Sequence, residues 1–225
     1  MNEKIILVTG GTDGLGKAIV EKLAKHEHFK IISFSRNIPT EKIPNVDYVI
    51  ADISNSEIIE SAVEQLLNKY KKIDCLINNA GIISERPFVK EEYSTIKKII
   101  DINTIGTMYV TRACLPKMYE LNSGQIINIV SLGGLSVSTL KPVYNTSKWA
   151  ITGFTKCLEE DAIKHGIKVT GIYPGTIKTN IFEKNNIEND LTRAIEPNDI
   201  ALIVENLITS KSTFYVSDIS LKFYH

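Results

Sequence analysis

Short apolar runs alternate with segments of helical periodicity from one end of this 225-residue chain to the other. Strands that alternate with helices in this way fold into a parallel sheet, because each crossover helix returns the chain to the same edge. The alternation therefore predicts a doubly wound α/β fold, a seven-stranded parallel sheet with helices on both faces. The candidate strands are residues 5–8, 30–34, 48–51, 73–77, 126–130, 169–172 and 214–216.

The helical segments separate into short and long ones. Residues 15–23 and 58–67 each place their apolar side chains on one face, as helices that cover a sheet do. Longer single helices are expected over residues 91–119 and 144–165. Pro197 occupies the first position of a last helix, where its missing N–H is not needed.

Residues 174–196 are the only long stretch without a periodic pattern. A loop of that length in a compact domain usually serves a function, so we expect a short substrate lid around residues 175–196. A hydrophobic content of 43% over 225 residues is enough for one core. We therefore expect one domain over residues 1–225.

Charge and composition argue against several classes of function. The 26 basic and 26 acidic residues balance, so no net charge draws the chain to nucleic acid or to a membrane surface. The first apolar run is too short for a signal sequence, which makes a cytoplasmic location the default expectation. Cys75, Cys114 and Cys157 lie in apolar segments, as reduced core thiols do, and the histidines and cysteines lack metal-ligand spacing, so no metal is expected.

A glycine-rich turn, residues 9–16, follows the first strand and opens the first helix. At such a turn a dinucleotide pyrophosphate can approach the backbone and meet the amides of the helix N-terminus. The turn thus predicts a Rossmann-type sheet with a bound dinucleotide. The spacing Gly10-x-x-x-Gly14-x-Gly16 departs from the commoner G-x-G-x-x-G, and a purely structural turn is the alternative.

The end of the second strand indicates which dinucleotide binds. No carboxylate stands at residues 33–37 to hold a ribose 2′-hydroxyl, and Arg36 offers a planar set of donors that suits a 2′-phosphate. NADP(H) is therefore favoured over NAD(H). Two observations oppose this: Asp13 adds a negative charge to the glycine turn, and an exposed Arg36 could be only a solvated turn residue.

Tyr144 and Lys148 are four residues apart, so on a helix they share a face. A neighbouring cation favours the phenolate, and we expect Lys148 to lower the pKa of Tyr144 toward a useful range. Ser131 follows the strand at residues 126–130, where its hydroxyl could polarise a carbonyl. Each residue alone has a structural explanation, but the set in this order does not.

Together, the glycine turn, Asn78-Asn79-Ala80-Gly81 after the fourth strand and the Tyr144-x-x-x-Lys148 pair resemble the short-chain dehydrogenase/reductase family. The resemblance covers residues 4–179. It implies a catalytic set in which Ser131 holds the carbonyl, Tyr144 is the acid or base, Lys148 also binds the nicotinamide ribose, and Asn103 holds a relay water. The implied cofactor contacts are Gly10, Thr12, Asp13, Gly14, Leu15, Gly16, Ser35, Arg36, Asp52, Ile53, Asn79, Ala80, Gly81, Tyr144, Lys148, Pro174, Gly175, Ile177 and Thr179.

The resemblance leads us to expect an NADP(H)-dependent oxidoreductase that interconverts a carbonyl and an alcohol on a small molecule. The alternative is a regulatory protein of the same fold that binds NADP(H) without turnover. The family also implies a homodimer or homotetramer built on the two long helices. The expected oligomer contacts are Ile96, Ile100, Met108, Trp149, Phe154 and Leu158, and the expected substrate pocket is lined by Ile83, Leu135, Val137, Val143, Ile181 and Phe182 with Ser136, Ser138, Thr139 and Lys141.

Overall fold

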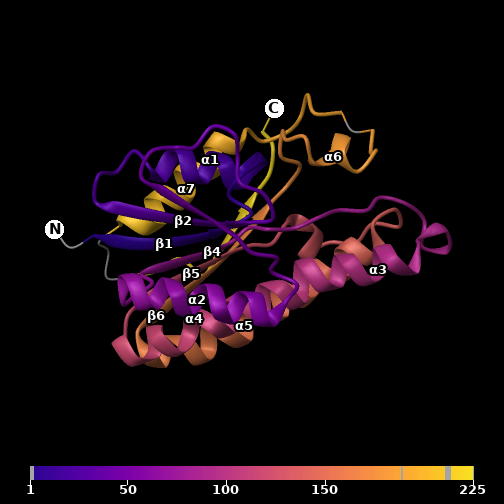
Figure 1. The fold of residues 1–225 in the computed structure, drawn as a ribbon. Helices are drawn as coiled ribbons and strands as arrows, with labels where there is room; N and C mark the ends of the chain where they lie inside the picture. Colours follow the sequence, from indigo (N-terminus) through magenta and orange to yellow (C-terminus); the bar gives the residue numbers. More distant parts are fainter. Residues whose placement is uncertain (1–2, 189, 211–213, 225) are drawn as a thin grey trace.

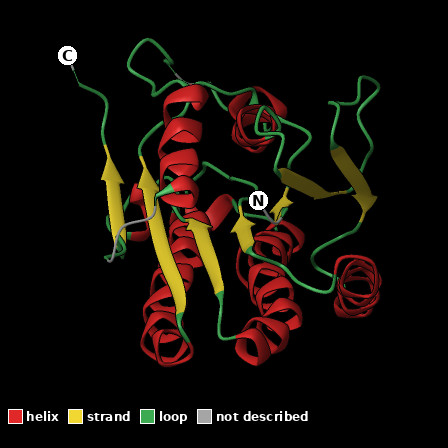
Figure 2. Ribbon diagram, turned by 90° about the vertical axis from the view of Figure 1, so that its left-hand side faces the viewer, coloured by secondary structure: helices red, strands yellow, loops and turns green. Residues whose placement is uncertain are grey.

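The computed structural model describes residues 3–188, 190–210 and 214–224. Its strands form a seven-stranded sheet in the order β3-β2-β1-β4-β5-β6-β7, and each neighbouring pair is parallel (Figure 2). The doubly wound α/β fold expected from the alternating pattern is confirmed. The strands are β1 (Lys4–Thr9), β2 (Phe29–Ser35), β3 (Val46–Ile50), β4 (Cys75–Asn78), β5 (Gly124–Ile129), β6 (Ile167–Pro174) and β7 (Asp218–Leu221).

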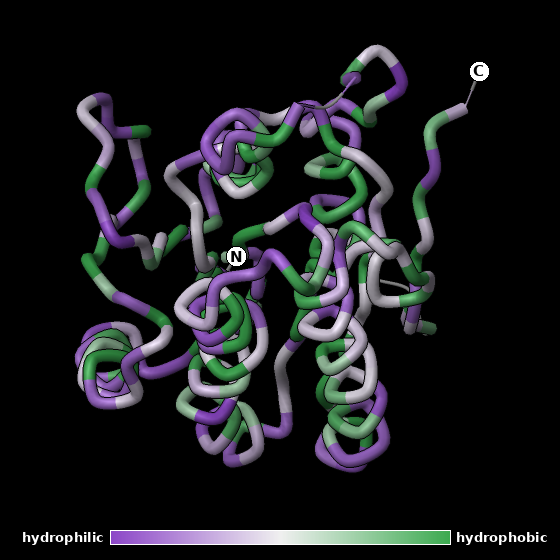
Figure 3. Tube along the Cα trace, turned by 90° about the vertical axis from the view of Figure 1, so that its right-hand side faces the viewer, coloured by the Kyte–Doolittle hydropathy of each residue, from purple (hydrophilic) through white to green (hydrophobic). Residues whose placement is uncertain are grey.

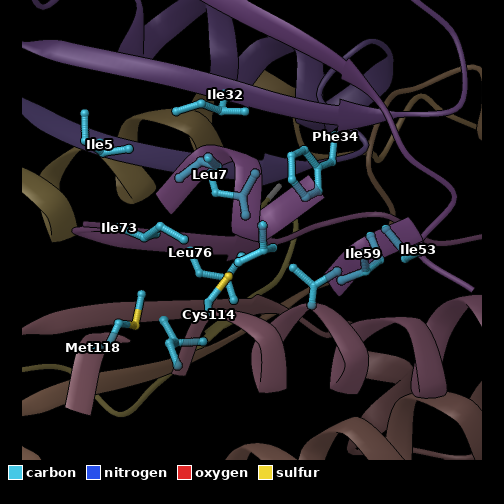
Figure 4. Close-up of a cluster of buried hydrophobic side chains, with 14 of the residues drawn as sticks. Ile5, Leu7, Ile32, Phe34, Ile53, Ile59, Ile73, Leu76, Cys114 and Met118 are labelled. Atoms are coloured by element: carbon cyan, nitrogen blue, oxygen red, sulfur yellow. The ribbon is translucent and has the colours of Figure 1, made fainter. Parts of the chain in front are cut away.

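Helices cover both faces of the sheet (Figure 1). α1 (Gly14–Leu23) and α7 (Pro197–Thr209) pack on one face, and their buried side chains join those of β1 and β2 in one core cluster. α2 (Ser56–Tyr70), α4 (Thr107–Leu121) and α5 (Pro142–Ala162) pack on the other, around the cluster drawn in Figure 4. Hydrophobic and hydrophilic residues alternate along these helices, as one-sided burial requires (Figure 3).

The single long helix expected over residues 91–119 is wrong in detail. The chain forms α3 (Tyr93–Ile100), then a π-helical segment (Asp101–Gly106), then α4. Gly106, at the end of this segment, packs so closely on Ile53 that a Cβ at this position would lie 2.8 Å from Cγ1 of Ile53. Helical periodicity reveals neither this contact nor the wider π-helical turn.

The last strand, which the sequence predicts at residues 214–216, lies elsewhere in the structure. The structure forms β7 at Asp218–Leu221, paired with β6 from Gly171↔Asp218 onward. β7 lies at the edge of the sheet, so its residues alternate between exposed and half-buried, and a search for an apolar run misses it. Residues 214–216 lie before it, and the Val216 carbonyl accepts a hydrogen bond from the Thr170 hydroxyl at 2.7 Å.

The stretch at residues 174–196 contains more structure than the sequence indicates. It carries the short helix α6 (Ile181–Lys184), and the Ile177↔Ile195 bridge closes its base.

The three cysteines are free thiols, but Cys157 is exposed on α5 rather than in the core. Within the described ranges, no helix combines the length and apolar character that a bilayer span needs. Nor do three or more His, Cys, Asp or Glu side chains of those ranges gather as a metal site would need.

Candidate active site

A cleft of about 830 Å³ opens at the carboxyl ends of the strands. The chain leaves β1 toward β2 and β3 on one side and toward β4 and β5 on the other, which is the switch point where open α/β sheets bind ligands. All of the expected cofactor contacts, from Gly10 to Thr179, line this cleft, and so does Ser131. A second hollow of about 770 Å³, between α7 and residues 221–224, contains none of them.

The glycine turn is held tightly against the end of β4. Asn79 donates from its backbone N to Oγ1 of Thr9 (3.0 Å) and from its side chain to the carbonyls of Thr9 (3.0 Å) and Gly10 (3.3 Å). A Cβ on Gly16 would lie 2.1 Å from the Gly10 carbonyl oxygen, so only glycine permits this turn. Gly14 has φ +49° and faces Thr179 across the cleft. The result is a cradle whose backbone is open at the glycines, suited to a pyrophosphate.

The ends of β2 and β3 form the neighbouring wall. Arg36 is exposed, directly after the buried Ser35. Asp52 accepts two hydrogen bonds at Oδ1, from the backbone N (2.9 Å) and the hydroxyl (2.7 Å) of Ser54. These bonds from Ser54, together with the charge of Arg36, lower the pKa of Asp52 although burial opposes them. Asp52 is thus a turn-forming carboxylate that also faces the cleft.

Ser131, Tyr144 and Lys148 come together from two elements. Ser131 follows β5 with φ +141°, an uncommon value for serine, and its Oγ accepts a hydrogen bond from the N of Gly133 at 3.0 Å. Pro142 starts α5, which places Tyr144 in the first turn and Lys148 one turn later. The Lys148 Nζ lies 5.8 Å from the Tyr144 ring centroid and donates to the Ile129 carbonyl at 3.2 Å.

Lys148 does not lower the pKa of Tyr144 as their four-residue spacing predicts. Burial raises the pKa of Tyr144, and a hydrogen bond with Ser131 lowers it by less. Burial also lowers the pKa of Lys148 to about 8. Lys148 is not a fixed point charge beside Tyr144, because the same desolvation acts on both side chains and disfavours both charged forms.

Asn103 does not line the cleft. It is buried in the π-helical segment, where its Oδ1 accepts from the backbone N of Ile82 (2.8 Å) and its Nδ2 donates to the Ile82 carbonyl (2.9 Å). A Cβ on Gly81 would lie 3.3 Å from the Asn103 Oδ1, so Asn103 sits directly behind the cleft wall. In this arrangement the side chain of Asn103 fixes the loop after β4.

A family model described as short chain dehydrogenase matches residues 4–190. The chain belongs to this family. An oxidoreductase of Staphylococcus aureus (strain MW2), itself uncharacterized, is 31% identical over 231 residues, covering 99% of this chain and 98% of the relative. The ligand-free aldohexose dehydrogenase of Thermoplasma acidophilum has a TM-score of 0.87 at 25% identity, covering 97% and 92% of the two chains. ElxO with NADP bound has a TM-score of 0.86 at 26% identity, covering 97% of each.

The substrate end of this dehydrogenase differs in part from the expected pocket. Ile83, Ser136, Ser138, Lys141, Ile181 and Phe182 line the cleft. Leu135, Val137, Thr139 and Val143 do not: Val137 is 87% exposed, and Val143 points into the core of the protein. Helical spacing cannot separate these cases, because a short 3-10 helix (Leu132–Gly134) and a turn precede α5.

Two ion pairs of the cleft were missed from the sequence. Lys141 pairs with Glu85 at 3.0 Å, which joins the start of α5 to the loop after β4. Lys184 of α6 pairs with Asp13 of the glycine turn. Each pair joins residues that are far apart in the chain, and no sequence signal relates them.

Proposed function

We propose that this protein is an NADP(H)-dependent oxidoreductase that interconverts a carbonyl and an alcohol on a small molecule. One observation carries the proposal: the glycine cradle and the Ser131, Tyr144 and Lys148 side chains open into the same cleft. A dinucleotide bound at that cradle would lie in the same cleft as these side chains. The protein contributes position and proton transfer.

The cradle fits a dinucleotide because its backbone is bare where a Cβ would close it, at Gly10 and Gly16. When bound, NADP(H) supplies the hydride that passes to or from the carbonyl carbon. Ser131 then donates to the carbonyl oxygen, and Tyr144 gives that oxygen its proton in reduction or removes it in oxidation. Lys148 would hold the ribose hydroxyls, and Ile177 and Thr179 would bind the carboxamide. For Asn103 we keep the relay role that the family resemblance implies, with its side chain behind Gly81 and bonded to Ile82 and Ser147.

The charges around the ribose pocket support our proposal of NADP(H) rather than NAD(H). Arg36 is exposed, lines the cleft and has no carboxylate beside it on residues 33–37. The objection from Asp13 loses weight, because Lys184 pairs with Asp13 and lowers its pKa, so the pair adds little net charge to the cradle. ElxO, whose solved structure is similar at 26% identity, has NADP bound.

The test is a panel of aldehydes and ketones with NADPH or NADH, followed by cofactor consumption. Arg36→Ala should raise KM for NADPH by about tenfold and leave KM for NADH nearly unchanged, because it removes a charge-assisted contact to the 2′-phosphate. Arg112→Ala, which removes an exposed arginine of α4 outside the cleft, is the matched control. Equal effects of Arg36→Ala on both cofactors would reject the NADP(H) preference.

The alternative, an NADP(H)-binding regulator, predicts tight NADPH binding with no consumption on any member of the panel. Ser131, Tyr144 and Lys148 in one cleft argue against it, since binding alone does not need a proton donor.

We further propose that the chain works as one domain with residues 175–196 as the lid. The buried free thiols Cys75 and Cys114 suit the reducing cytoplasm, the location we propose.

A further inference from the structure

Ser147 lies between the two α5 residues to which we assign chemistry, yet it does not line the cleft. It is completely buried, with 0% of its surface exposed. Its Oγ donates to the carbonyl of Tyr144 at 2.6 Å and accepts from Nδ2 of Asn103 at 3.0 Å. Its own carbonyl accepts from the hydroxyl of Thr104 at 3.2 Å. One small side chain thus connects the turn that carries Tyr144 and Lys148 to the π-helical segment.

The π-helical segment is in turn connected to the cleft wall. Asn103 binds both backbone groups of Ile82, next to Gly81. A Cβ on Gly81 would lie 3.3 Å from the Asn103 Oδ1 and 3.7 Å from the Lys148 Nζ. The loop after β4, the π-helical segment and α5 therefore meet at one point. Two hydrogen bonds join the last two, one at the Ser147 hydroxyl and one from the Thr104 hydroxyl to the Ser147 carbonyl.

We infer that Ser147 is a positioning residue, whose hydroxyl sets the catalytic turn of α5 relative to Asn103 and the loop after β4. Because buried hydrogen-bonding groups require partners, removing the hydroxyl leaves the Asn103 Nδ2 with one partner fewer and frees the turn to shift. The inference rests on the proposed function, since it assigns Ser147 to the positions of Tyr144 and Lys148. It predicts that removing the Ser147 hydroxyl lowers turnover by more than the loss of folding stability explains.

Ser147→Ala tests this, because it removes only the hydroxyl. A displacement of ~1 Å in an active site can cost about 10²-fold in rate, so turnover should fall by between about tenfold and 10²-fold. The dissociation constant of NADPH should change by less than about threefold, since most of its expected contacts lie on other elements. Ser147→Cys keeps a weaker hydrogen-bonding group of similar size, so its turnover should lie between those of wild type and Ser147→Ala. If Ser147→Ala does not fold, Ser147→Cys replaces it.

Thr155→Val is the matched control. Thr155 is also completely buried on α5, accepts from an asparagine amide (Asn128, 2.8 Å) and donates to a carbonyl of its own helix (Ile151, 2.7 Å), but it touches none of the proposed catalytic residues. Its loss should lower Tm to a similar extent and leave turnover within about twofold of wild type. Equal losses of turnover in Ser147→Ala and Thr155→Val would overturn the inference, and so would wild-type turnover in Ser147→Ala.

A double-mutant cycle with Asn103→Ala separates the specific junction from general loosening. The two changes should be strongly non-additive in turnover, because both break the same connection. Amide hydrogen exchange adds a measurement that needs no substrate: residues 101–106 and 144–148 should both exchange faster in Ser147→Ala but not in Thr155→Val. If the wild type reduces no carbonyl, the proposed function fails while exchange still decides whether the junction exists. Unchanged exchange in both segments, or additive effects on turnover, would reject it.

Discussion

At the scale of single residues, burial shifts the pKa values of Tyr144 and Lys148, two neighbours in the cleft, in opposite directions. Burial disfavours charge, so it raises the pKa of the Tyr144 phenol and lowers the pKa of the Lys148 ammonium to about 8. Tyr144 therefore keeps its proton near neutral pH, as a general acid must. Lys148 can lose its proton at a pH where an ordinary lysine is still charged.

Tyr144→Phe should separate binding from chemistry, because it removes one hydroxyl and keeps the ring. General acid catalysis typically contributes 10²–10⁴-fold, so the turnover number should fall by at least about 10²-fold. The dissociation constant of NADPH, measured by fluorescence titration, should stay within about threefold of the wild-type value. Tyr119→Phe, which removes a hydroxyl bonded to Asp161 outside the cleft, is the control. Near wild-type turnover in Tyr144→Phe would remove this residue from the mechanism.

Lys148 should also make stability depend on pH. The folded protein releases this proton near pH 8 and the unfolded chain near 10.5, so between these values the unfolded chain binds more protons and the free energy of unfolding should rise with pH. Below pH 8 the buried charge destabilises the folded protein. The free energy of unfolding of Lys148→Met should therefore exceed that of wild type by about 1–2 kcal/mol at pH 7. This figure already subtracts the cost of the one hydrogen bond that the substitution removes.

That advantage should shrink when urea unfolding is repeated at pH 9.5, a pH below the range in which Tyr144 ionises. Lys164→Met is the control, because Lys164 is exposed and its replacement should change stability little at either pH. An advantage of Lys148→Met that stays constant or grows from pH 7 to 9.5 would contradict the proposed origin of the pH dependence.

At the scale of elements, the ion pair between Asp13 and Lys184 links the glycine turn to α6 across the cleft. Both side chains are about half exposed, so the pair should contribute little to global stability. It can still bias a lid, because a lid is held by few contacts and small free energies shift its position. The lid base is held separately, by the Ile177↔Ile195 bridge.

Lys184→Ala should therefore speed amide hydrogen exchange in residues 181–187 and leave Tm within about 1 °C, since it removes one exposed ion pair. NADPH should also dissociate faster in stopped-flow measurements. Lys17→Ala is the matched control: Lys17 is equally exposed and pairs with Glu21 within α1, so it does not touch the lid. The same exchange rates in wild type and Lys184→Ala would show that the ion pair does not restrain α6.

At the scale of the whole molecule, the structure sorts the residues expected at an oligomer interface. Trp149 is 47% exposed on α5, whereas Leu158 is buried in the core and Phe154 packs against it. Ile96, Ile100 and Met108 are half-buried. Leu158 is therefore excluded as a contact, and Trp149 is the strongest remaining candidate for the homo-oligomer that we propose.

Light scattering at micromolar concentration should give the mass of a dimer or tetramer. Trp149→Glu should lower that mass, because a charge replaces an apolar contact at the centre of the proposed interface. Ile58→Glu places a charge at a similarly exposed apolar position of α2 and should leave the mass unchanged. A monomeric wild type, or an unchanged mass in Trp149→Glu, would count against an interface on α5.

The sequence alone determined the order of the elements, the parallel sheet and the expected cofactor contacts that line the cleft. Apolar runs, periodicity and glycine turns act between neighbours in the chain, so they can be seen without a structure. Arg36 was assigned to the cleft from its place at the end of the second strand, and Asp52 from the family resemblance.

Only the tertiary structure decided what depends on contacts between distant segments. The π-helical segment with its close Gly106–Ile53 contact, the register of β7 with β6, and the pairing of Asp13 with Lys184 are of this kind. The pKa directions of Tyr144 and Lys148 belong with these, because burial is a property of the packed protein and not of a four-residue spacing.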